Sequence, residues 1–285
     1  MNKIFIIATS DMVFPYDKFG KMGRVHSIFS NSFNLVVNHK LIHVSDSEKF
    51  LSGFGIQIDR DNFKQIRQTL QIGQLVILKE ELIVLYGSSQ VYQLFFSANC
   101  TRLIKQKIKK VVYTLQEKKL LQKVVKDTLK NLKIGLADDT RFQEIQDELT
   151  IGILTNQKID SAIKYLIGRG VGLTPTGDDL LLGYAFGLEI FDAFPIIEVL
   201  KNYSDYWSRM TTNVSQAYLD SLLENRVSSP VFRLNQAIYD KNKIQIKNCL
   251  QAVQETGHTS GVDFLFGFLL SLNYIDQNNE NARIT

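Results

Sequence analysis

Two short segments in the second half of the chain carry the residue types most suited to chemistry. They read Thr-Gly-Asp-Asp at residues 176–179 and Ser-Gly-Val-Asp at residues 260–263. Each is followed by apolar residues, a glycine and an aromatic residue, so the two segments align without a gap. A hydroxyl three residues before an acid is typical of a helix start, and glycine lets a backbone or ligand approach closely. The repeat therefore predicts two helix starts that carry hydroxyl and carboxylate groups.

The residues after each segment are apolar on all sides of a helix, which predicts that both helices are buried. Gly183 and Gly267 are expected to allow them to pack closely. Helix starts present backbone N–H groups that have no partner within the helix, and such groups bind anions. Buried polar groups cost free energy unless they are paired, so we expect the two segments to meet in a small polar pocket. The alternative is that both are ordinary capped helices of the core.

Candidate site residues come from these segments and from the polar residues before them. Asp178, Asp179 and His258 are the candidate catalytic residues. The candidate substrate-binding residues of this region are Thr174, Thr176, Gly177, Thr259, Ser260, Gly261 and Asp263. No histidine or cysteine spacing typical of a metal site is present, and we expect neither a metal nor a cofactor.

The glycine run at residues 168–172 invites comparison with a dinucleotide-binding loop. It follows a predicted helix rather than a strand and lacks the strand–helix–strand setting that such a loop needs. We therefore do not assign a dinucleotide to it.

The elements that position these residues fall into two classes. In the first hundred residues, short apolar stretches flank polar turns, which is a hairpin signal. The stretches are residues 34–37 with 41–44, 75–78 with 82–86, and 91–97. Only residues 61–70 have helical character in this part. Several short strands joined by tight turns predict a small antiparallel sheet or barrel over residues 1–100.

Helical spacing of apolar residues begins at about residue 101 and continues to the end of the chain. It covers residues 104–115, 121–132, 159–167 and 214–222. The sequence therefore predicts an α+β fold, with a β-rich domain over residues 1–100. The helical domain over residues 101–285 carries both motifs.

Charge and composition argue against nucleic-acid-binding and membrane functions. The net charge is +4, from 33 basic and 29 acidic residues. Ten lysines lie between residues 105 and 133, mostly away from the apolar positions, which indicates a solvated helix face. Without interleaved arginine or aromatic residues we expect no nucleic-acid partner. The two cysteines and the lack of a long apolar run predict a cytoplasmic protein without a membrane partner.

Three segments of the chain resemble motifs of the AllH-like family. They are residues 170–179, 211–215 and 257–263, and residues 23–27 add a weaker match that contains Arg24 and His26. The first family motif usually reads Gly-Leu-Thr-Pro-Ser-Gly-Asp-Asp, and Thr176 replaces its serine here. The resemblance spans most of the chain, although the lysine-rich middle contributes nothing to it.

The resemblance implies a subunit of a bacterial oxamate carbamoyltransferase of allantoin, and hence purine nitrogen, catabolism. Such an enzyme moves a carbamoyl group between oxalurate and phosphate, giving oxamate and carbamoyl phosphate. It implies a small anionic ligand (phosphate, carbamoyl phosphate or an oxalurate-like compound) and partner protein subunits. Arg24 and His26 would add positive charge to substrate binding. Asp178 and Asp179, which would repel an anion, would bind a carbamoyl NH₂ group, orient His258 or hold a cation. The competing hypothesis is a non-catalytic subunit that binds a small anion or assists assembly.

Overall fold

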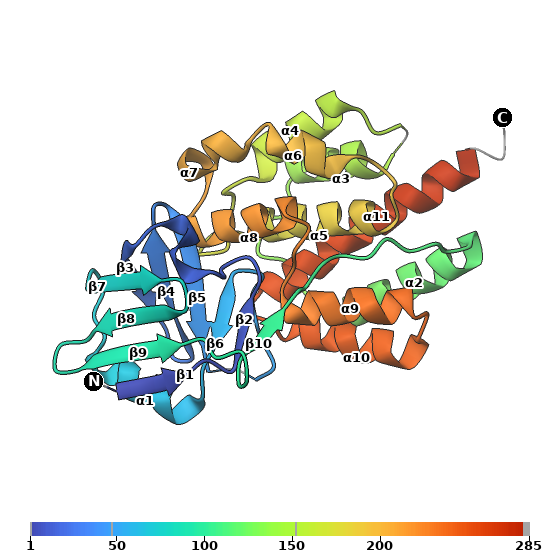
Figure 1. Ribbon diagram of the computed structural model, residues 1–285. Coiled ribbons are helices and arrows are strands. Elements are labelled where there is room, and N and C mark those ends of the chain that lie inside the picture. The colour runs from blue at the N-terminus through green and yellow to red at the C-terminus, as the bar shows by residue number, and fades with distance from the viewer. Residues whose placement is uncertain (1, 47, 152, 282–285) are drawn as a thin grey trace. The chain divides into compact units, whose positions relative to one another are not determined.

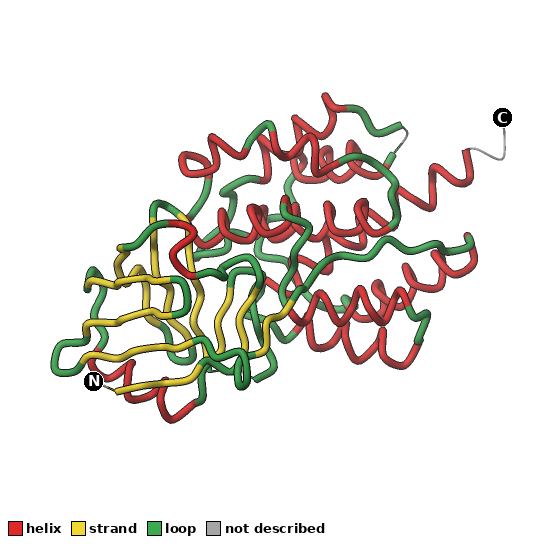
Figure 2. Tube along the Cα trace, viewed as in Figure 1, coloured by secondary structure: helices red, strands yellow, loops and turns green. Residues whose placement is uncertain are grey.

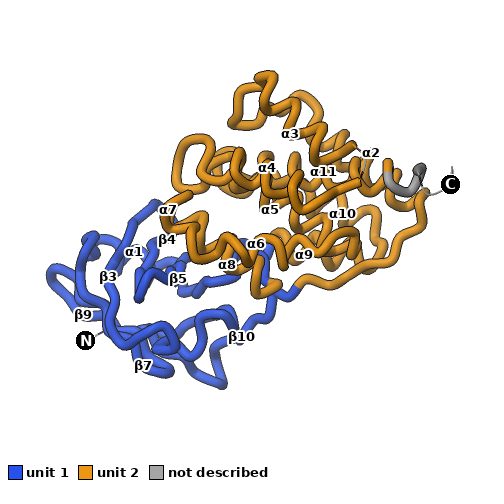
Figure 3. The backbone as a smooth tube through the Cα atoms, turned by 90° about the horizontal axis from the view of Figure 1, so that it is seen from above, with its two compact units in different colours: residues 1–107, 226–229 blue, residues 108–225, 230–285 orange. Residues whose placement is uncertain are grey.

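The computed structural model describes residues 2–46, 48–151 and 153–281 (Figure 1). It consists of two compact units, residues 1–107 with 226–229 and residues 108–225 with 230–285 (Figure 3). In the described residues the first unit is built on a β-sheet and the second on helices. This confirms the predicted α+β fold class.

A ten-stranded mixed sheet forms the first unit among the described residues (Figure 2). Its spatial order is β1-β9-β8-β7-β3-β4-β5-β6-β2-β10. The strands are β1 (Asn2–Phe5), β2 (Ala8–Ser10), β3 (Met22–Ile28), β4 (Ser32–Val37), β5 (Lys40–Ser45), β6 (Gly55–Gln57), β7 (Leu75–Lys79), β8 (Leu82–Tyr86), β9 (Val91–Phe95) and β10 (Arg102–Ile104). Strands β1 and β2 are consecutive in the chain, but β1 lies at one end of this order and β2 next to the other end, so the sheet curls back on itself.

The predicted hairpins are present. Strand β4 pairs antiparallel with β5, and β7 pairs antiparallel with β8. The sheet is not purely antiparallel, however, because β1–β9, β2–β10 and β5–β6 are parallel pairs. Parallel strands cannot be joined by a tight turn, so local turn signals could not reveal them.

Two helical elements belong to the sheet unit. They are the 3-10 helix η1 (Tyr16–Phe19) and α1 (Arg60–Thr69), which the spacing of its apolar residues had predicted. Asp59 caps α1 by accepting the N–H of Asn62. The distant segment 226–229 joins the unit through Arg226, whose guanidinium pairs with the Asp11 carboxylate at 2.6 and 3.0 Å. This pairing shows why the unit is not continuous in sequence.

The second unit contains α2 to α11 and a 3-10 helix. They are α2 (Leu115–Thr128), α3 (Thr140–Thr150), α4 (Asn156–Leu166), α5 (Thr176–Ile190), α6 (Ile196–Lys201), η2 (Ser204–Tyr206), α7 (Trp207–Met210), α8 (Asn213–Leu223), α9 (Ser229–Tyr239), α10 (Lys243–Gln254) and α11 (Ser260–Asn281). Helices α2, α4 and α8 match the spacing-based predictions. Helix α5 is buried over nearly its whole surface and forms the centre of this unit.

The prediction of a helix over residues 104–115 is wrong. Ile104 ends strand β10, and α2 begins only at Leu115. Between them the chain is extended: Ile108 and Val111 are buried while Val112 is 89% exposed. The side-chain amide of Asn235 accepts the N–H of Lys109 at 2.7 Å and donates to its carbonyl at 2.9 Å. A side chain therefore supplies the pairing that a helix would have made internally, and spacing alone could not show this.

Among the described residues, no helix combines the length and the apolar character that a membrane crossing requires.

Candidate functional site

The two motif-bearing helices lie side by side and run in the same direction (Figure 1). The position of a Cβ atom on Gly183 would be 1.8 Å from the Phe264 carbonyl oxygen. On Gly267 it would be 1.9 Å from the Leu180 carbonyl oxygen. These four residues occupy equivalent places in the repeat, so the contact between α5 and α11 is reciprocal. Only glycine permits such a close approach.

The repeat also includes the helix that precedes each motif. A Cβ on Gly177 would lie 1.9 Å from the carbonyl oxygen of Leu166, the last residue of α4. A Cβ on Gly261 would lie 1.9 Å from the carbonyl oxygen of Val253, near the end of α10. The pairs α4–α5 and α10–α11 are thus two copies of one arrangement. Each motif glycine fixes its helix start against the end of the helix before it.

Hydrogen bonds cross between the two motifs at the helix starts. Thr176 Oγ1 donates to Asp263 Oδ2 at 2.9 Å. In the equivalent position of the other copy, the Ser260 hydroxyl hydrogen-bonds to Asp179, and Ser260 Oγ lies 2.7 Å from Thr174 Oγ1. The predicted proximity of the two motifs is therefore confirmed.

The capping expected within α5 is wrong. Pro175 occupies the cap position of α5 and provides no side-chain cap. Thr176 instead donates across to α11, because the parallel packing brings the partner carboxylate within reach. The spacing of hydroxyl and acid, typical of a capping box within one helix, here connects two helices.

Backbone donors at the start of α5 are already used. The N–H of Gly177 donates to the Arg169 carbonyl at 2.8 Å. The N–H groups of Asp178 and Asp179 donate to the Pro175 carbonyl at 2.9 and 3.2 Å. At the start of α11, the Gly261 N–H donates to the carbonyl of Thr256 at 3.0 Å. The expectation of free helix-start donors is therefore wrong for these groups, since the chain before each helix folds back onto it.

Asp178 is completely buried and fully paired. Its Oδ1 accepts the backbone N–H of Gly168 at 2.7 Å, and its Oδ2 accepts the hydroxyl of Thr211. Burial raises the pKa of Asp178, while hydrogen bonding by Ser215, Thr211 and Gly168 lowers it. Asp178 thus connects the end of α4, the start of α5 and the loop before α8.

Asp263 is equally buried, at 1% exposure, and is also paired through both oxygens. Besides the Thr176 hydroxyl, it accepts the backbone N–H of Gly135 at 3.0 Å through Oδ1. Burial raises the pKa of Asp263, and hydrogen bonding by Gly135, Thr176 and Thr259 lowers it. This hydrogen bond therefore holds the loop between α2 and α3 against the Asp263 carboxylate.

Asp179 differs from the other two carboxylates. It is 5% exposed, and among the described residues no donor reaches its Oδ2. Burial raises the pKa of Asp179 well above its ordinary value, and the nearby Asp263 and Asp178 raise it further, whereas hydrogen bonding by Ser260 and Thr174 lowers it. A buried carboxylate oxygen without a donor is costly. Of the oxygens of these three carboxylates, Asp179 Oδ2 is the one for which no partner is found among the described residues.

The remaining candidates take less central positions. His258 and Thr259 lie exposed in the turn before α11, where the Thr259 carbonyl accepts the N–H of Asp263 at 3.0 Å. In the described residues no hydrogen bond joins His258 to a carboxylate of the motifs. Arg24 and His26 belong to β3 of the sheet unit; Arg24 donates to the carbonyl of Gly73, and His26 Nδ1 lies 3.1 Å from Ser27 Oγ.

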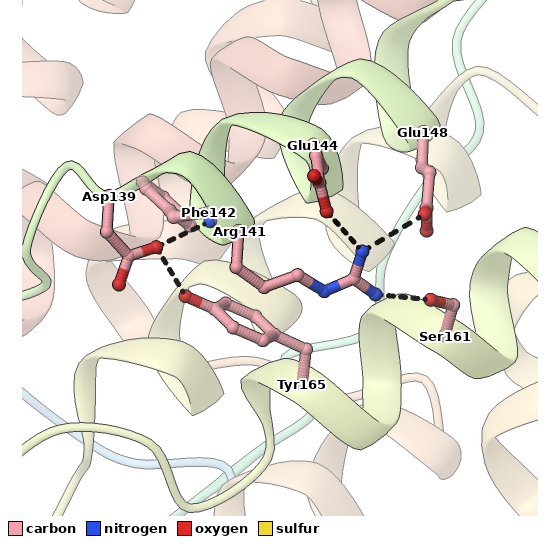
Figure 4. A network of polar contacts seen from close by, with 7 residues as sticks. All are labelled: Asp139, Arg141, Phe142, Glu144, Glu148, Ser161 and Tyr165. Carbon is pink, nitrogen blue, oxygen red and sulfur yellow. Dashed lines mark hydrogen bonds and ion pairs between the residues drawn. The ribbon is translucent and has the colours of Figure 1, made fainter.

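A polar network fixes α4, whose end supports the Gly177 contact (Figure 4). Arg141 of α3 pairs with Glu144 at 2.7 Å and donates to Ser161 Oγ of α4 at 3.1 Å. Tyr165 of α4 reaches the Asp139 carboxylate at 3.5 Å, which also caps α3. Exposed ion pairs add little stability individually, so the effect of the network is mainly to orient α4 relative to α3.

Several residues of the site were not among the predicted ones. Thr211 and Ser215 donate hydrogen bonds to the Asp178 carboxylate. Thr212 caps α8 by accepting the Ser215 N–H at 3.1 Å. Their place in the motif at residues 211–215 was the available signal. Gly168 and Gly135 act through backbone N–H groups, which residue type does not reveal, and Gly135 lies in a segment without any motif.

A cavity of about 410 Å³ lies beside the same region. Its lining residues come from the end of α2, the following loop and α11: Lys126, Asp127, Leu129, Lys130, Leu132, Ile134, Val262, Phe266 and Leu269. None of the three buried carboxylates is among them, so this apolar cavity is separate from the carboxylate cluster. In the described residues no group of three or more histidine, cysteine or acidic side chains has the arrangement of a metal site.

Two family models match the chain. Residues 166–272 match the oxamate carbamoyltransferase subunit AllH, and residues 8–99 match the AllH family N-terminal domain. The chain belongs to the AllH family. The first match contains all three buried carboxylates, and the second contains Arg24 and His26 of this AllH-family protein. No solved structure matches the chain.

The family name is that of a subunit of oxamate carbamoyltransferase. For this AllH-family chain the name indicates a carbamoyltransferase subunit, and a subunit implies partner subunits. Gly135, whose backbone N–H donates to Asp263 Oδ1, lies outside both matched segments.

Proposed function

We propose that the chain is a subunit of a carbamoyltransferase that acts on oxalurate or oxamate and carbamoyl phosphate, and that the paired motifs bind its small substrate. The observation that carries the proposal is the Oδ2 atom of Asp179, buried and without a donor among the described residues. Folding does not leave such a group unpaired without a cost. A ligand with an N–H or O–H group would remove that cost.

The chemistry of carbamoyl transfer suits such a site. The oxamate nitrogen attacks the carbamoyl carbon, forming an N–C bond while the C–O bond to phosphate breaks. Phosphate leaves with the bonding electron pair, and the nitrogen gives up one proton to a base. Both oxygens of Asp178 are occupied, so Asp179 is the buried carboxylate with room to receive that proton. Burial raises the pKa of Asp179, and a raised pKa makes a carboxylate a stronger base.

The anionic ends of the substrates need positive charge or hydrogen-bond donors. Within the helical unit we propose the hydroxyls of Thr174 and Thr259 for this role, with Thr176 and Ser260 holding Asp263 and Asp179 toward the substrate and His258 as a proton-transferring residue at the exposed turn. Arg24 and His26 are proposed separately as substrate-binding residues of the sheet unit. Gly177 and Gly261 would contribute by keeping the two helix starts in place. The reaction would belong to the breakdown of allantoin.

The second candidate is a non-catalytic subunit that binds a small anion or assists assembly. The position of His258 favours it, since this imidazole lies in an exposed turn and makes no hydrogen bond to the motif carboxylates in the described residues. In that case the partner subunits would carry the chemistry.

The experiment is a reconstitution of the chain with the proteins encoded beside its gene. Conversion of oxalurate and phosphate to oxamate and carbamoyl phosphate is followed for the wild-type chain, for Asp179→Asn and for Asp139→Asn. The last is a matched control, since Asp139 caps α3 by accepting the N–H of Phe142. We expect kcat/KM to fall at least 100-fold for Asp179→Asn and to stay within twofold for Asp139→Asn. Equal activity of all three complexes would favour the non-catalytic candidate.

A further inference from the structure

The two halves of the repeat contain equivalent carboxylates that differ in their hydrogen-bond partners. Asp179 and Asp263 occupy the same place in their motifs, and each accepts a hydroxyl from the opposite helix start. Asp263 has in addition the backbone N–H of Gly135, at 3.0 Å from Oδ1. No described residue makes the corresponding contact with Asp179 Oδ2.

The contact at Asp263 is close and specific. A Cβ on Gly135 would lie 2.1 Å from Thr176 Oγ1 and 3.6 Å from Asp263 Oδ2. The loop therefore brings a bare peptide group directly against the hydroxyl–carboxylate pair. Its donor is the N–H of a neutral amide.

A second amide contact supports the same preference. Asp178 Oδ1 accepts the backbone N–H of Gly168 at 2.7 Å. Two of the three buried carboxylates of the site thus accept an amide N–H from a glycine. A neutral donor adds no charge to the interior but satisfies the carboxylate through a charge-assisted hydrogen bond.

We infer that the chain binds one small carboxamide through Asp179 Oδ2, and that Gly135 occupies the equivalent position at Asp263 as an internal copy of the ligand N–H. The inference rests on the proposed function, since it names the group of the substrate that this site holds. The half-site at Asp263 is closed by the chain itself. Binding therefore has a stoichiometry of one carboxamide per chain.

The residues that precede the two helix starts are exposed. Thr174 and Ser260, whose hydroxyls lie 2.7 Å apart and next to Asp179, are only half-buried. Residues 171–173 and 257–259, which precede them in the chain, are exposed. The chain next to Asp179 at both helix starts is therefore open to solvent, and Asp179 itself is 5% exposed.

The test compares ligands that differ in their N–H groups. Calorimetric titration of the full chain uses oxamate, oxalate, which has a carboxylate in place of the amide, and N,N-dimethyloxamate, which lacks the N–H. We expect oxamate to bind with a stoichiometry of one and at least tenfold more tightly than either analogue. Equal binding of oxamate and N,N-dimethyloxamate would overturn the inference, and this comparison needs no variant to fold.

The variants locate the contact. Asp179→Asn should weaken oxamate binding at least tenfold, while Asp139→Asn, the same chemical change at the cap of α3, should leave it within twofold. Unchanged binding by Asp179→Asn overturns the inference even where the reconstituted complex transfers carbamoyl groups. Binding of oxamate through Asp179 in a complex without transfer activity supports the inference and rejects the proposed function. The two failures are therefore distinguishable.

Discussion

The α5 and α11 copies of the repeat share a sequence pattern, but their equivalent carboxylates differ in hydrogen bonding. At α11, Asp263 is satisfied by Thr176 from the other helix and by the Gly135 loop. At α5, Asp179 shares hydrogen bonding with Ser260 and Thr174, yet its Oδ2 has no donor among the described residues. Duplication thus provides two equivalent positions, and one loop from outside the repeat makes them different.

This difference in hydrogen bonding also affects how each carboxylate contributes to the stability of the fold. A buried carboxylate that the chain pairs fully contributes to the folded state, whereas one with an unpaired oxygen costs free energy. Asp178 belongs with Asp263 in this respect, since the chain occupies both of its oxygens. The repeat therefore combines two carboxylates that are paired through both oxygens with one whose Oδ2 has no partner among the described residues.

The largest expected effect concerns what the two copies share. Gly183→Ala and Gly267→Ala each place a methyl group within 2 Å of a backbone carbonyl oxygen of the other helix. We expect each to lower the free energy of unfolding by about 3 kcal/mol, since neither backbone can move away independently. Chemical denaturation measures both variants.

Gly172→Ala is the control, because no atom lies within 4 Å of a Cβ there and its φ of +92° alone is unfavourable. We expect that change to cost about 1 kcal/mol. A large difference between Gly183→Ala and Gly267→Ala would contradict the reciprocal packing.

The next effect concerns the loop that makes the copies different. Gly135→Ala forces a methyl group against Thr176 Oγ1 and should displace the loop from Asp263, at a cost of about 2 kcal/mol. The displaced loop would open the second half-site, so we expect the stoichiometry of oxamate to rise from one toward two. Denaturation and calorimetry on the same variant check both outcomes. A stable variant with unchanged stoichiometry would show that the loop does not close the half-site.

The sequence predicted the repeat and its consequences more fully than it predicted the connections. The glycine and aromatic positions after each motif indicated closely packed helices, and Gly183 and Gly267 confirm this. Likewise, the alternation around polar turns identified the hairpins β4–β5 and β7–β8. Both signals are local and depend on side-chain type.

What could not be predicted depends on backbone groups and distant partners. The N–H of Gly135 reaches a residue 128 positions away, and no property of a glycine side chain signals this. The extended segment before α2 depends on Asn235, 126 positions from Lys109. The crossed bond from Thr176 to Asp263 could not be told from a cap within one helix until the pairing of α5 and α11 was known.

A smaller effect separates the two equivalent carboxylates. Asp263→Asn loses charge-assisted bonds from Gly135 and Thr176 and should cost about 2 kcal/mol. Asp179→Asn changes a buried carboxyl group whose Oδ2 has no donor, so we expect its cost to stay below about 0.5 kcal/mol in the absence of ligand. Denaturation midpoints at neutral pH measure the difference. Equal destabilisation by the two changes would show that Asp179 is as structural as Asp263.

The smallest effect is in the pH dependence of that difference. Burial raises the pKa of Asp179 in the folded chain, so the folded state binds its proton more tightly than the unfolded state does. The corresponding stability is present below the unfolded pKa of about 3.9 and is lost as pH rises through the folded value. Asp179→Asn removes this loss, and its stability relative to the wild-type chain should therefore increase between pH 5 and pH 8.

Other groups titrate in both proteins and cancel in the comparison. The pKa of Glu117 is lowered to about 2 by Lys241 and Thr114, and that of His43 to about 4 by burial. Denaturation midpoints of the wild-type chain, Asp179→Asn and Asp139→Asn at several pH values isolate the contribution of Asp179. At high pH, saturating oxamate should stabilise the wild-type chain more than Asp179→Asn, because an ionised carboxylate accepts the stronger hydrogen bond. A relative stability of Asp179→Asn that stays constant from pH 5 to pH 8 would mean that this carboxylate keeps its charge state throughout, and the contrast with Asp263 would then depend on hydrogen bonding alone.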